Sequence, residues 1–309
     1  MSTSVGSRNA RGRVPAPADV LALGRSRSRA TRNAIATVAA YATFVIAMIP
    51  LVWIIGTVLN KGIGLVVNPN WWWESQRGVT IRRVGGGAYH AIIGSLEMAL
   101  LCAAISVPIA ILGAVYLVEY GRRGPIARAI SFCVDILTGV PSIVAALFVY
   151  ALWISLFGFA RTAFAVSLAL VLLMIPVVLR STEEMLRLVP NELREAALAL
   201  GTPRWRVILK VVLPTAFSGI VTGVVLGLAR IMGETAPLLI LGPYTKDINV
   251  NPFSGSMAAL PTMINQDRTE SLQAAVDRTW SAALTLILLV LVLNIIARAI
   301  GRFSSVRGK

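Results

Sequence analysis

Six long apolar blocks constrain the fold of this 309-residue chain more than any other feature. An α-helix needs roughly 20 apolar residues to cross the hydrocarbon core of a bilayer. The blocks cover residues 35–59, 91–119, 129–157, 162–179, 215–241 and 280–299. Because lipid satisfies no backbone polar group, only helices or closed barrels span it. The pattern therefore predicts an all-α polytopic membrane protein with about six transmembrane helices.

The composition excludes several other classes of protein. The chain is 56% hydrophobic and 14% charged, with a mean hydropathy of +0.76, which is too apolar for a soluble domain. The net charge of +15 does not indicate nucleic-acid binding, because the basic residues lie between apolar blocks and form no aromatic and basic module. The two cysteines, Cys102 and Cys133, lie inside apolar blocks, so we expect no disulfide framework and no metal site.

The distribution of Lys and Arg predicts the orientation, because cytoplasmic connections carry the excess of these residues. Seven precede the first block, three follow the second, six lie between the fourth and fifth and four at the C-terminus, so one side carries 20 against 8 on the other. We expect a multi-pass membrane protein with both termini cytoplasmic. Residues 1–34 form a basic tail near anionic lipid, 35–303 the transmembrane domain and 304–309 a second tail.

A long outer segment, residues 60–88, contains Trp71, Trp72 and Trp73. Tryptophan is enriched where a membrane meets water. We expect an interfacial anchor here, and a docking site for an external partner is the alternative.

The stretch between the fourth and fifth blocks, residues 181–214, is too polar to span a membrane and too apolar for an unstructured linker. Leu193, Ala197 and Leu200 recur at helical spacing. Gly201 can end this helix, and Pro203 can begin another. We expect two short helices with a break between them on the cytoplasmic face.

Four residues of this loop carry a resemblance to a known family. Glu195, Ala196 and Ala197 are followed by Gly201, and V-x-L-P comes at residues 211–214. This pattern resembles the EAA loop of importer-type ABC transporter permeases, with valine where isoleucine is usual. The resemblance implies that the four residues belong to a coupling helix that sits in a groove of an ATP-hydrolysing subunit. The chain has no G-x-x-x-x-G-K-[ST] motif, so we expect no catalytic residues and no cofactor, with ATP bound by a partner subunit.

Further stretches resemble the phosphate-specific permeases, and among them the PstA type. They are GGGAYHAIIGSLEMAL, AVYLVEYG, TGVPSIVAALFVY, LRSTEEMLRLVPNELREAALALG, ARIMGETAPLL and LNIIAR, in the order of the family. Ser95, where threonine is common, and the Arg-rich tail depart from the pattern. The resemblance implies the membrane subunit of an ATP-driven importer of inorganic phosphate, located in a bacterial plasma membrane. It also implies a PstC-type second permease subunit, a PstB-type ATP-binding dimer and a PstS-type extracytoplasmic phosphate-binding protein.

Arg230 and Glu234 lie inside an apolar block, where a charged side chain costs roughly 2.5–3.5 kcal/mol on insertion scales. At a spacing of four residues they share a helix face and can pair. Gly219, Gly223 and Gly227 continue that face and allow a neighbouring helix to approach closely. We expect the pair to face the bundle and its partner, where a guanidinium can attract an anion. The resemblance also implies a place in the phosphate pathway, and a structural ion pair is the alternative.

The sequence 139–141, Gly-Val-Pro, lies inside the third block and predicts a broken or kinked helix. A broken helix end offers backbone N–H groups to an anion. The hydroxyl groups of Thr138 and Ser142 lie beside it, so both join the predicted substrate pathway, with a simple packing kink as the alternative. We expect Asp135 and Glu97 to be paired within the bundle.

Three other functions fit parts of the pattern. An intramembrane hydrolase is disfavoured because the single histidine, His90, has no acidic partner nearby in the sequence. A secondary transporter also uses buried charges and broken helices, but it has no EAA loop, and this chain shows no internal repeat. An ABC permease for sulfate, molybdate or a polar organic solute differs from the predicted importer in cargo alone.

Overall fold

The computed structural model describes residues 27–80, 85–121 and 124–306. These residues form helices and short connections, and no strand occurs among them. The prediction of an all-α chain is confirmed. The chain divides into two compact units, Met1–Gly56 and Thr57–Lys309.

The first unit contains most of α2, a single helix from Arg27 to Val66. The predicted first span, residues 35–59, lies inside this helix, and Pro50 does not end it. Residues 27–34, which the sequence places in the basic tail, are helical, while residues 1–26 of that predicted tail lie outside the described residues. Apolar side chains such as Trp53, which is 74% exposed, cover the helix in this unit. A helix that is apolar all round requires lipid or another protein around it.

The second unit holds the remaining helices, and three of them continue into π-helical turns. In chain order the elements are α3 (Asn70–Trp73), α4 (Tyr89–Val115), η1 (Tyr116–Tyr120), α5 (Pro125–Gly139), α6 (Ser142–Val149), η2 (Tyr150–Leu156), α7 (Ala163–Arg187), α8 (Asn191–Ala199), α9 (Arg204–Val207), η3 (Ile208–Val212), α10 (Leu213–Met232), α11 (Ala236–Leu241), α12 (Leu260–Asp267) and α13 (Gln273–Val306). In the described part of the chain, 5 helices are long and apolar enough to cross a membrane, and the bent pair α5 and α6 gives a sixth if it counts as one span. This agrees with the expected number.

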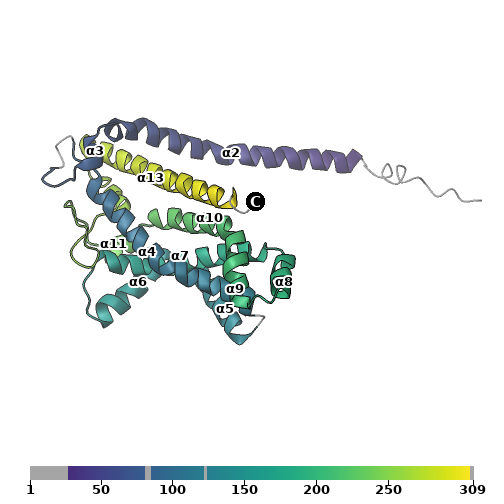
Figure 1. The fold of residues 1–309 in the computed structure, drawn as a ribbon. Coiled ribbons are helices and arrows are strands. Elements are labelled where there is room, and N and C mark those ends of the chain that lie inside the picture. Colours follow the sequence, from purple (N-terminus) through teal and green to yellow (C-terminus); the bar gives the residue numbers. More distant parts are fainter. Residues whose placement is uncertain (1–26, 81–84, 122–123, 307–309) are drawn as a thin grey trace, which may run out of the picture. The chain divides into compact units, whose positions relative to one another are not determined.

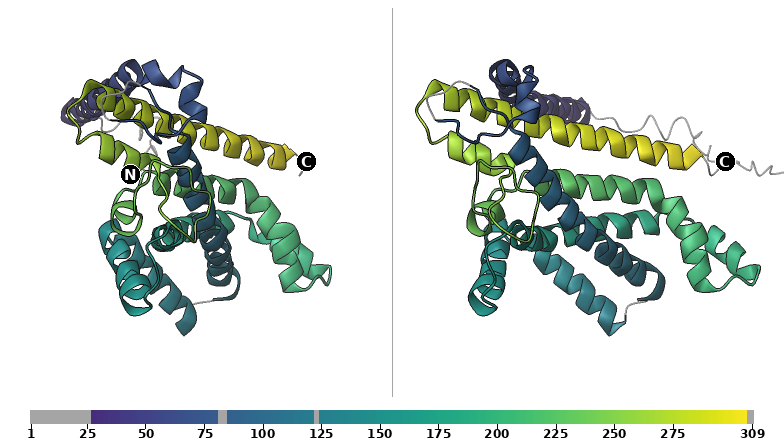
Figure 2. Two further views of the ribbon diagram at one scale, coloured as in Figure 1. Left: turned by 90° about the vertical axis from the view of Figure 1, so that its left-hand side faces the viewer. Right: turned by 60° about the vertical axis from the view of Figure 1, so that its left-hand side comes forward.

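Helix α7 lies at the centre of the second unit. Helices α4 and α10 pack against it, and α13 lies beside α10 (Figures 1 and 2). In the most apolar window of α7, 67% of the residues are buried, against 33% or less in the other spans. The other spans therefore leave most of their surface for lipid or for other chains.

Helix α10 approaches α7 through its glycines, as predicted. A Cβ atom at Gly223 would lie 2.1 Å from the Oγ atom of Ser181 on α7. Small residues at every fourth position allow this close contact. The same face continues through Gly227 to Ile231, which is 2% exposed. It does not continue to Arg230, which is exposed.

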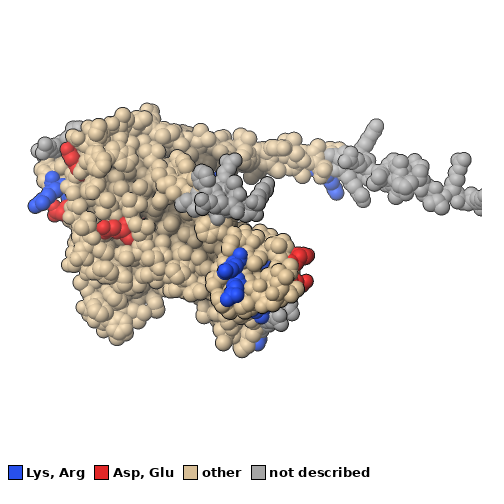
Figure 3. All heavy atoms as spheres, in the orientation of Figure 1, with Lys and Arg blue, Asp and Glu red and all other residues tan. Residues whose placement is uncertain are grey.

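Charged side chains of the second unit gather toward its two ends, with an apolar band between them (Figure 3). One end carries α8 and α9, and we call it the α8 end. The opposite end carries α3. This distribution is typical of a membrane protein, because charged groups avoid the hydrocarbon core.

The three tryptophans at the opposite end differ in burial and in hydrogen-bond partners. Trp71 is 1% exposed and donates its Nε1–H to Thr285 Oγ1 at 2.8 Å. Trp72 donates to the carbonyl oxygen of Val66 at 2.8 Å, and Trp73 is 74% exposed. The interpretation as a shared interfacial anchor is therefore wrong for Trp71, which belongs to the core.

Candidate functional site: two broken spans and the α8 loop

The third predicted span is broken. Helix α5 ends at Gly139, α6 begins at Ser142, and the two helices make an angle of 109°. Pro141 is the N-cap residue of α6 and has no N–H to donate. The predicted break is confirmed, and residues 129–157 form two helical segments across it rather than one continuous helix.

Thr138 and Ser142 lie on the two sides of this break. The Thr138 hydroxyl donates a hydrogen bond of 2.8 Å to the carbonyl oxygen of Val134, one turn earlier in α5. Ser142 is the first residue of α6 and is half-buried. Its hydroxyl makes no hydrogen bond within the part of the chain that the structure describes. Ser142 therefore has a free donor at the break, while the donor of Thr138 is already used.

The structure separates Arg230 from Glu234. Helix α10 ends just before Gly233, and Glu234 lies beyond it, with its backbone N–H donating to the carbonyl oxygen of Ile231 at 3.1 Å. The predicted shared helix face is wrong, because α10 ends before Gly233 and the next helix, α11, begins at Ala236, with Pro237 in its first turn. Among the described residues, no ion pair joins Arg230 to Glu234.

The two breaks belong to neighbouring elements. Helix α11, which follows Glu234, packs against α6, which begins at Ser142, and both contact α7. Each break leaves backbone groups outside the helical hydrogen-bond pattern. The four residues of the predicted pathway therefore lie on two broken segments that meet through α6 and α11. Sequence reasoning missed the second break, although glycine at a helix end with proline at the next helix start was a usable signal.

The loop between α7 and α10 ends differently from the prediction. Helix α8 covers Asn191–Ala199, and Gly201 follows it with φ of +77°, a left-handed conformation that favours glycine. Pro203 is the N-cap of α9. However, α9 continues through η3 into α10, so a membrane span and not a separate short helix follows the break.

Helix α8 presents part of the EAA sequence to its surroundings. Glu195 and Ala196 are exposed, whereas Ala197 is half-buried against the core. Large apolar side chains lie exposed around them. These side chains, which we call the α8 patch, are Leu188, Leu193, Leu198, Leu200 and Trp205. An exposed apolar patch with charged neighbours is typical of a protein interaction surface.

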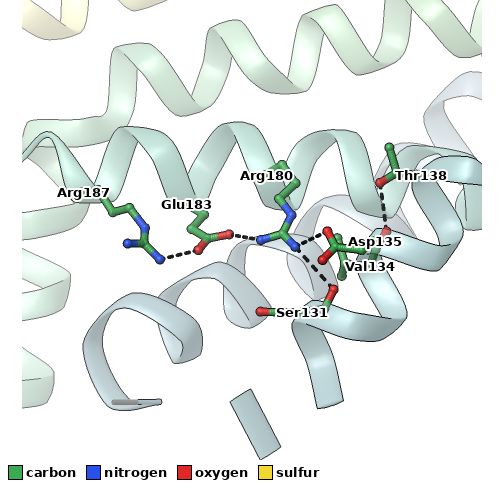
Figure 4. Close-up of polar contacts among 7 residues, drawn as sticks. All are labelled: Ser131, Val134, Asp135, Thr138, Arg180, Glu183 and Arg187. Carbon is green, nitrogen blue, oxygen red and sulfur yellow. Dashed lines mark hydrogen bonds and ion pairs between the residues drawn. The ribbon is translucent and has the colours of Figure 1, made fainter. Parts of the chain in front are cut away.

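Ion pairs join α8, η1, α7 and α5 at the α8 end. Arg194 of α8 donates to Glu119 Oε1 at 3.0 Å, and Glu119 is 6% exposed. Arg180 of α7 pairs with Asp135 of α5 and with Glu183, its neighbour on α7 (Figure 4). The expectation that Asp135 is paired is confirmed.

The expected pairing of Glu97, on α4, differs in its outcome from that of Asp135. Its Oε2 atom is buried, and no hydrogen-bond partner for it occurs among residues 27–80, 85–121 and 124–306. The prediction of a paired Glu97 is therefore wrong within those residues.

The opposite end holds a buried polar cluster that the sequence did not reveal. Asp267 accepts hydrogen bonds from Gln76 at 3.1 Å and from Arg278 at 3.4 Å. Tyr244 donates to Gln76 Oε1 at 3.2 Å, and its oxygen lies 3.5 Å from Nε2 of His90. Burial, with the nearby Asp267 carboxylate, raises the pKa of the Tyr244 hydroxyl and keeps it a neutral donor. The cluster joins the connection between α3 and α4, which contains Gln76, to the connection between α11 and α12, which contains Tyr244.

Known proteins are similar to this chain in sequence. The family model of the binding-protein-dependent transport system inner membrane component matches residues 106–306. The phosphate transport system permease protein PstA of Mycobacterium leprae (strain TN) is 51% identical over 279 residues, which are 90% of this chain and 91% of that protein. PstA of Xylella fastidiosa (strain Temecula1 / ATCC 700964) is 42% identical over 215 residues, which are 70% and 75% of the two chains.

Solved ABC transporters share the fold at low sequence identity. A chain of a bacterial alginate ABC transporter, solved with an alginate-bound periplasmic protein, matches with a TM-score of 0.61 and 16% identity over 90% of this chain and 98% of that chain. A chain of the inward-facing MetNI methionine ABC transporter matches with a TM-score of 0.56 and 19% identity over 71% and 94%. These likenesses concern the fold alone.

The fold and the α8 loop thus define an inner-membrane permease component of a binding-protein-dependent transport system. Within this class, the chain belongs to the family of PstA phosphate transport system permeases. The resemblance in the sequence is confirmed, and the chain is a multi-pass membrane protein.

Proposed function

We propose that this chain is the membrane-spanning subunit of an ATP-driven importer of inorganic phosphate. Its relatives at 51% and 42% identity are phosphate transport system permeases. The structural observation that supports an anionic cargo is Arg230, an exposed guanidinium at the end of an apolar helix and next to a helix break. Such a group is costly in lipid, so the position favours a polar pathway or a subunit interface.

The pathway in this proposal runs past the two breaks. Arg230 attracts the anion, and Ser142 offers its hydroxyl and helix N-terminus. Glu234 limits the net positive charge, so that phosphate is bound weakly enough to leave. Thr138 supports the α5 side of the break through its bond to Val134.

ATP enters this proposal through other subunits. Glu195, Ala196, Ala197 and Gly201 form the contact with a PstB-type ATP-binding dimer, and the exposed α8 patch supports such a contact. The chain itself hydrolyses no ATP and carries no cofactor, in keeping with its lack of a phosphate-binding loop motif. The remaining partners are a PstC-type permease subunit, which covers exposed helix faces, and a PstS-type binding protein on the outer side.

The orientation follows the basic residues. The α8 end and both termini lie in the cytoplasm, because their connections carry most of the Lys and Arg. Membrane-impermeant maleimide tests this in a Cys133→Ser background. Ala199→Cys on α8 should be labelled from the cytoplasmic side alone and Ser254→Cys at the opposite end from the outside alone, since both positions are exposed. Labelling with the reverse pattern contradicts the orientation.

Uptake of labelled phosphate by the reconstituted complex tests the function. Wild type should carry phosphate when ATP is present, and excess sulfate or molybdate should not compete. Arg230→Ala should lower uptake about 10-fold or more, because hydrogen bonds to charged groups are worth about 1.5–3 kcal/mol. Arg298→Ala removes an exposed arginine near the end of α13 and is the matched control.

Each outcome of this assay decides one point. If phosphate uptake survives Arg230→Ala, phosphate remains the cargo and Arg230 has a structural role. If the complex carries sulfate or molybdate in place of phosphate, the proposed cargo is wrong, whereas the assignment as a permease still holds. Uptake that persists without ATP but stops when the proton gradient collapses points to a secondary transporter.

A further inference from the structure

Helix α5 reaches the α8 end with no direct chain connection to α8. In the sequence, α8 follows α7 and precedes α9, whereas α5 lies between η1 and α6. Movement of α8 can therefore reach α5 through side-chain contacts. Besides the apolar packing of α5 against η1 and α7, these contacts include the ion pairs of Arg194 and Arg180.

Arg194 fixes α8 to two other elements. It donates to Glu119 Oε1 on η1 at 3.0 Å and to the carbonyl oxygens of Leu186 at 2.8 Å and Val189 at 2.6 Å. The exposed fractions of the Arg194 and Glu119 side chains are 15% and 7%. A buried guanidinium whose donors are all directed at fixed acceptors holds its elements in one geometry. Helix α8 is thereby fastened to the ends of α4 and α7.

Arg180 fixes α7 to α5. It pairs with Asp135 and donates to the carbonyl oxygen of Ser131 at 3.3 Å, both on α5 (Figure 4). On α7 it also donates to Glu183 at 2.7 Å, and Glu183 accepts a second bond of 2.7 Å from Arg187. Glu183 is 7% exposed, whereas the side chains of Arg187 and Asp135 are 66% and 67% exposed.

The contacts end next to the broken span. Asp135 lies one helical turn before Gly139, where α5 ends and the chain bends by 109° into α6. A helix break is a place where two rigid segments can change their angle. Among the described residues, nothing lies within 4 Å of a Cβ placed at Gly139, so the chain is not closely packed at this point.

We propose that Arg194 and Arg180 are positioning residues that carry movement of α8 to the α5–α6 break. Movement at α8 shifts η1 and α7 through Arg194, and α7 pulls α5 through Arg180 and Asp135. The angle at the break then changes, together with the position of Ser142. This inference rests on the proposed function for the direction of coupling, but its geometry concerns the chain alone.

Distance measurements in the whole importer test the proposal without any cargo. Spin labels at Ile126→Cys on α5 and Leu147→Cys on α6 report the angle at the break in a Cys133→Ser background, since both positions are exposed. We expect the label distance to change when ATP binds. Asp135→Asn should reduce that change by at least half, whereas Glu184→Gln, an exposed carboxylate beside Glu183, should leave it unchanged.

Uptake and ATP hydrolysis measured in the same vesicles give a second readout. Asp135→Asn and Glu119→Gln should lower phosphate uptake per ATP about 10-fold, within the range of typical coupling between sites. ATP hydrolysis should stay within about twofold of wild type. A merely structural role would lower uptake and hydrolysis together through loss of assembled complex. If Asp135→Asn does not assemble, Arg180→Lys keeps the charge and loses the forked contact, and the same changes are expected of it.

Three results overturn the proposal. They are a label distance that does not respond to ATP in wild type, a distance change that survives Asp135→Asn, and parallel loss of uptake and hydrolysis in assembled variants. A wild-type complex that carries no phosphate overturns the proposed cargo instead, and the distance measurement still decides the inference.

Discussion

Trp71 on α3 donates its Nε1–H to Thr285 Oγ1 on α13 at 2.8 Å, which joins positions 214 residues apart. Trp71→Phe should lower the free energy of unfolding by about 1–3 kcal/mol, because a buried hydrogen bond and some packing are lost. Thermal unfolding can be followed by dye labelling of buried Cys102 in a Cys133→Ser background. Trp73→Phe is the control, since Trp73 is 74% exposed and its change should stay within about 0.5 kcal/mol. Equal effects would contradict the burial of Trp71.

Asp267 and Arg278 form a buried pair at the opposite end, with exposed side-chain fractions of 5% and 2%. Asp267→Asn should lower the free energy of unfolding by about 3–5 kcal/mol, because the Arg278 charge loses its carboxylate in a buried site. Asp247 pairs with Arg77 at exposed fractions of 61% and 83%. Asp247→Asn should change the same quantity by less than about 1 kcal/mol. The same thermal assay measures both changes in the free energy of unfolding. A change of less than about 1 kcal/mol for Asp267→Asn would contradict the burial of the Asp267–Arg278 pair.

Gly223 lies against Ser181 at the contact between α10 and α7. Gly223→Ala should destabilise the protein by about 1–3 kcal/mol, because the added methyl group overpacks this contact. Gly64 is the matched control, as no atom of the described part of the chain lies within 4 Å of a Cβ placed there. Gly64→Ala should be neutral or stabilise by up to about 1 kcal/mol through helix propensity. A neutral Gly223→Ala would show that the two helices can separate slightly at no cost.

Glu97 and Glu183 should respond oppositely to the same substitution. Glu97→Leu should raise the free energy of unfolding by about 1–3 kcal/mol, because a buried oxygen without a described partner is removed. Glu183→Leu should lower it, since Arg180 and Arg187 both lose their acceptor. Unfolding of the purified complex measures both changes. Loss of stability in Glu97→Leu would mean that the carboxylate finds a partner in the assembled importer.

Much of the helical organisation was predictable from local sequence. Apolar blocks of span length predict helices because lipid leaves the backbone no other way to satisfy its polar groups. The break at 139–141 was also predictable, since Pro141 carries no N–H and Gly139 lies two residues before it, whereas Pro50 stands alone inside the continuous helix α2. Gly201 adopts the left-handed conformation expected of a glycine that ends a helix.

The second break was harder to predict. A glycine inside an apolar run, such as Gly233, is compatible with either a continuous or an ended helix, because glycine weakens a helix without excluding it. Extending the helix to Glu234 put that residue on the same face as Arg230. The tertiary structure instead ends α10 before Gly233, and α11 then packs on α6.

The sequence by itself determined the class of the chain, its spans and the position of the α8 loop, because these depend on local hydrophobicity and on motif spacing. Only the tertiary structure decided which charges meet. Arg194 and Glu119 are 75 residues apart, and Gln76 and Asp267 are 191 apart. An ion pair depends on where whole helices pack, and in a chain with many charged residues the sequence alone allows many pairings.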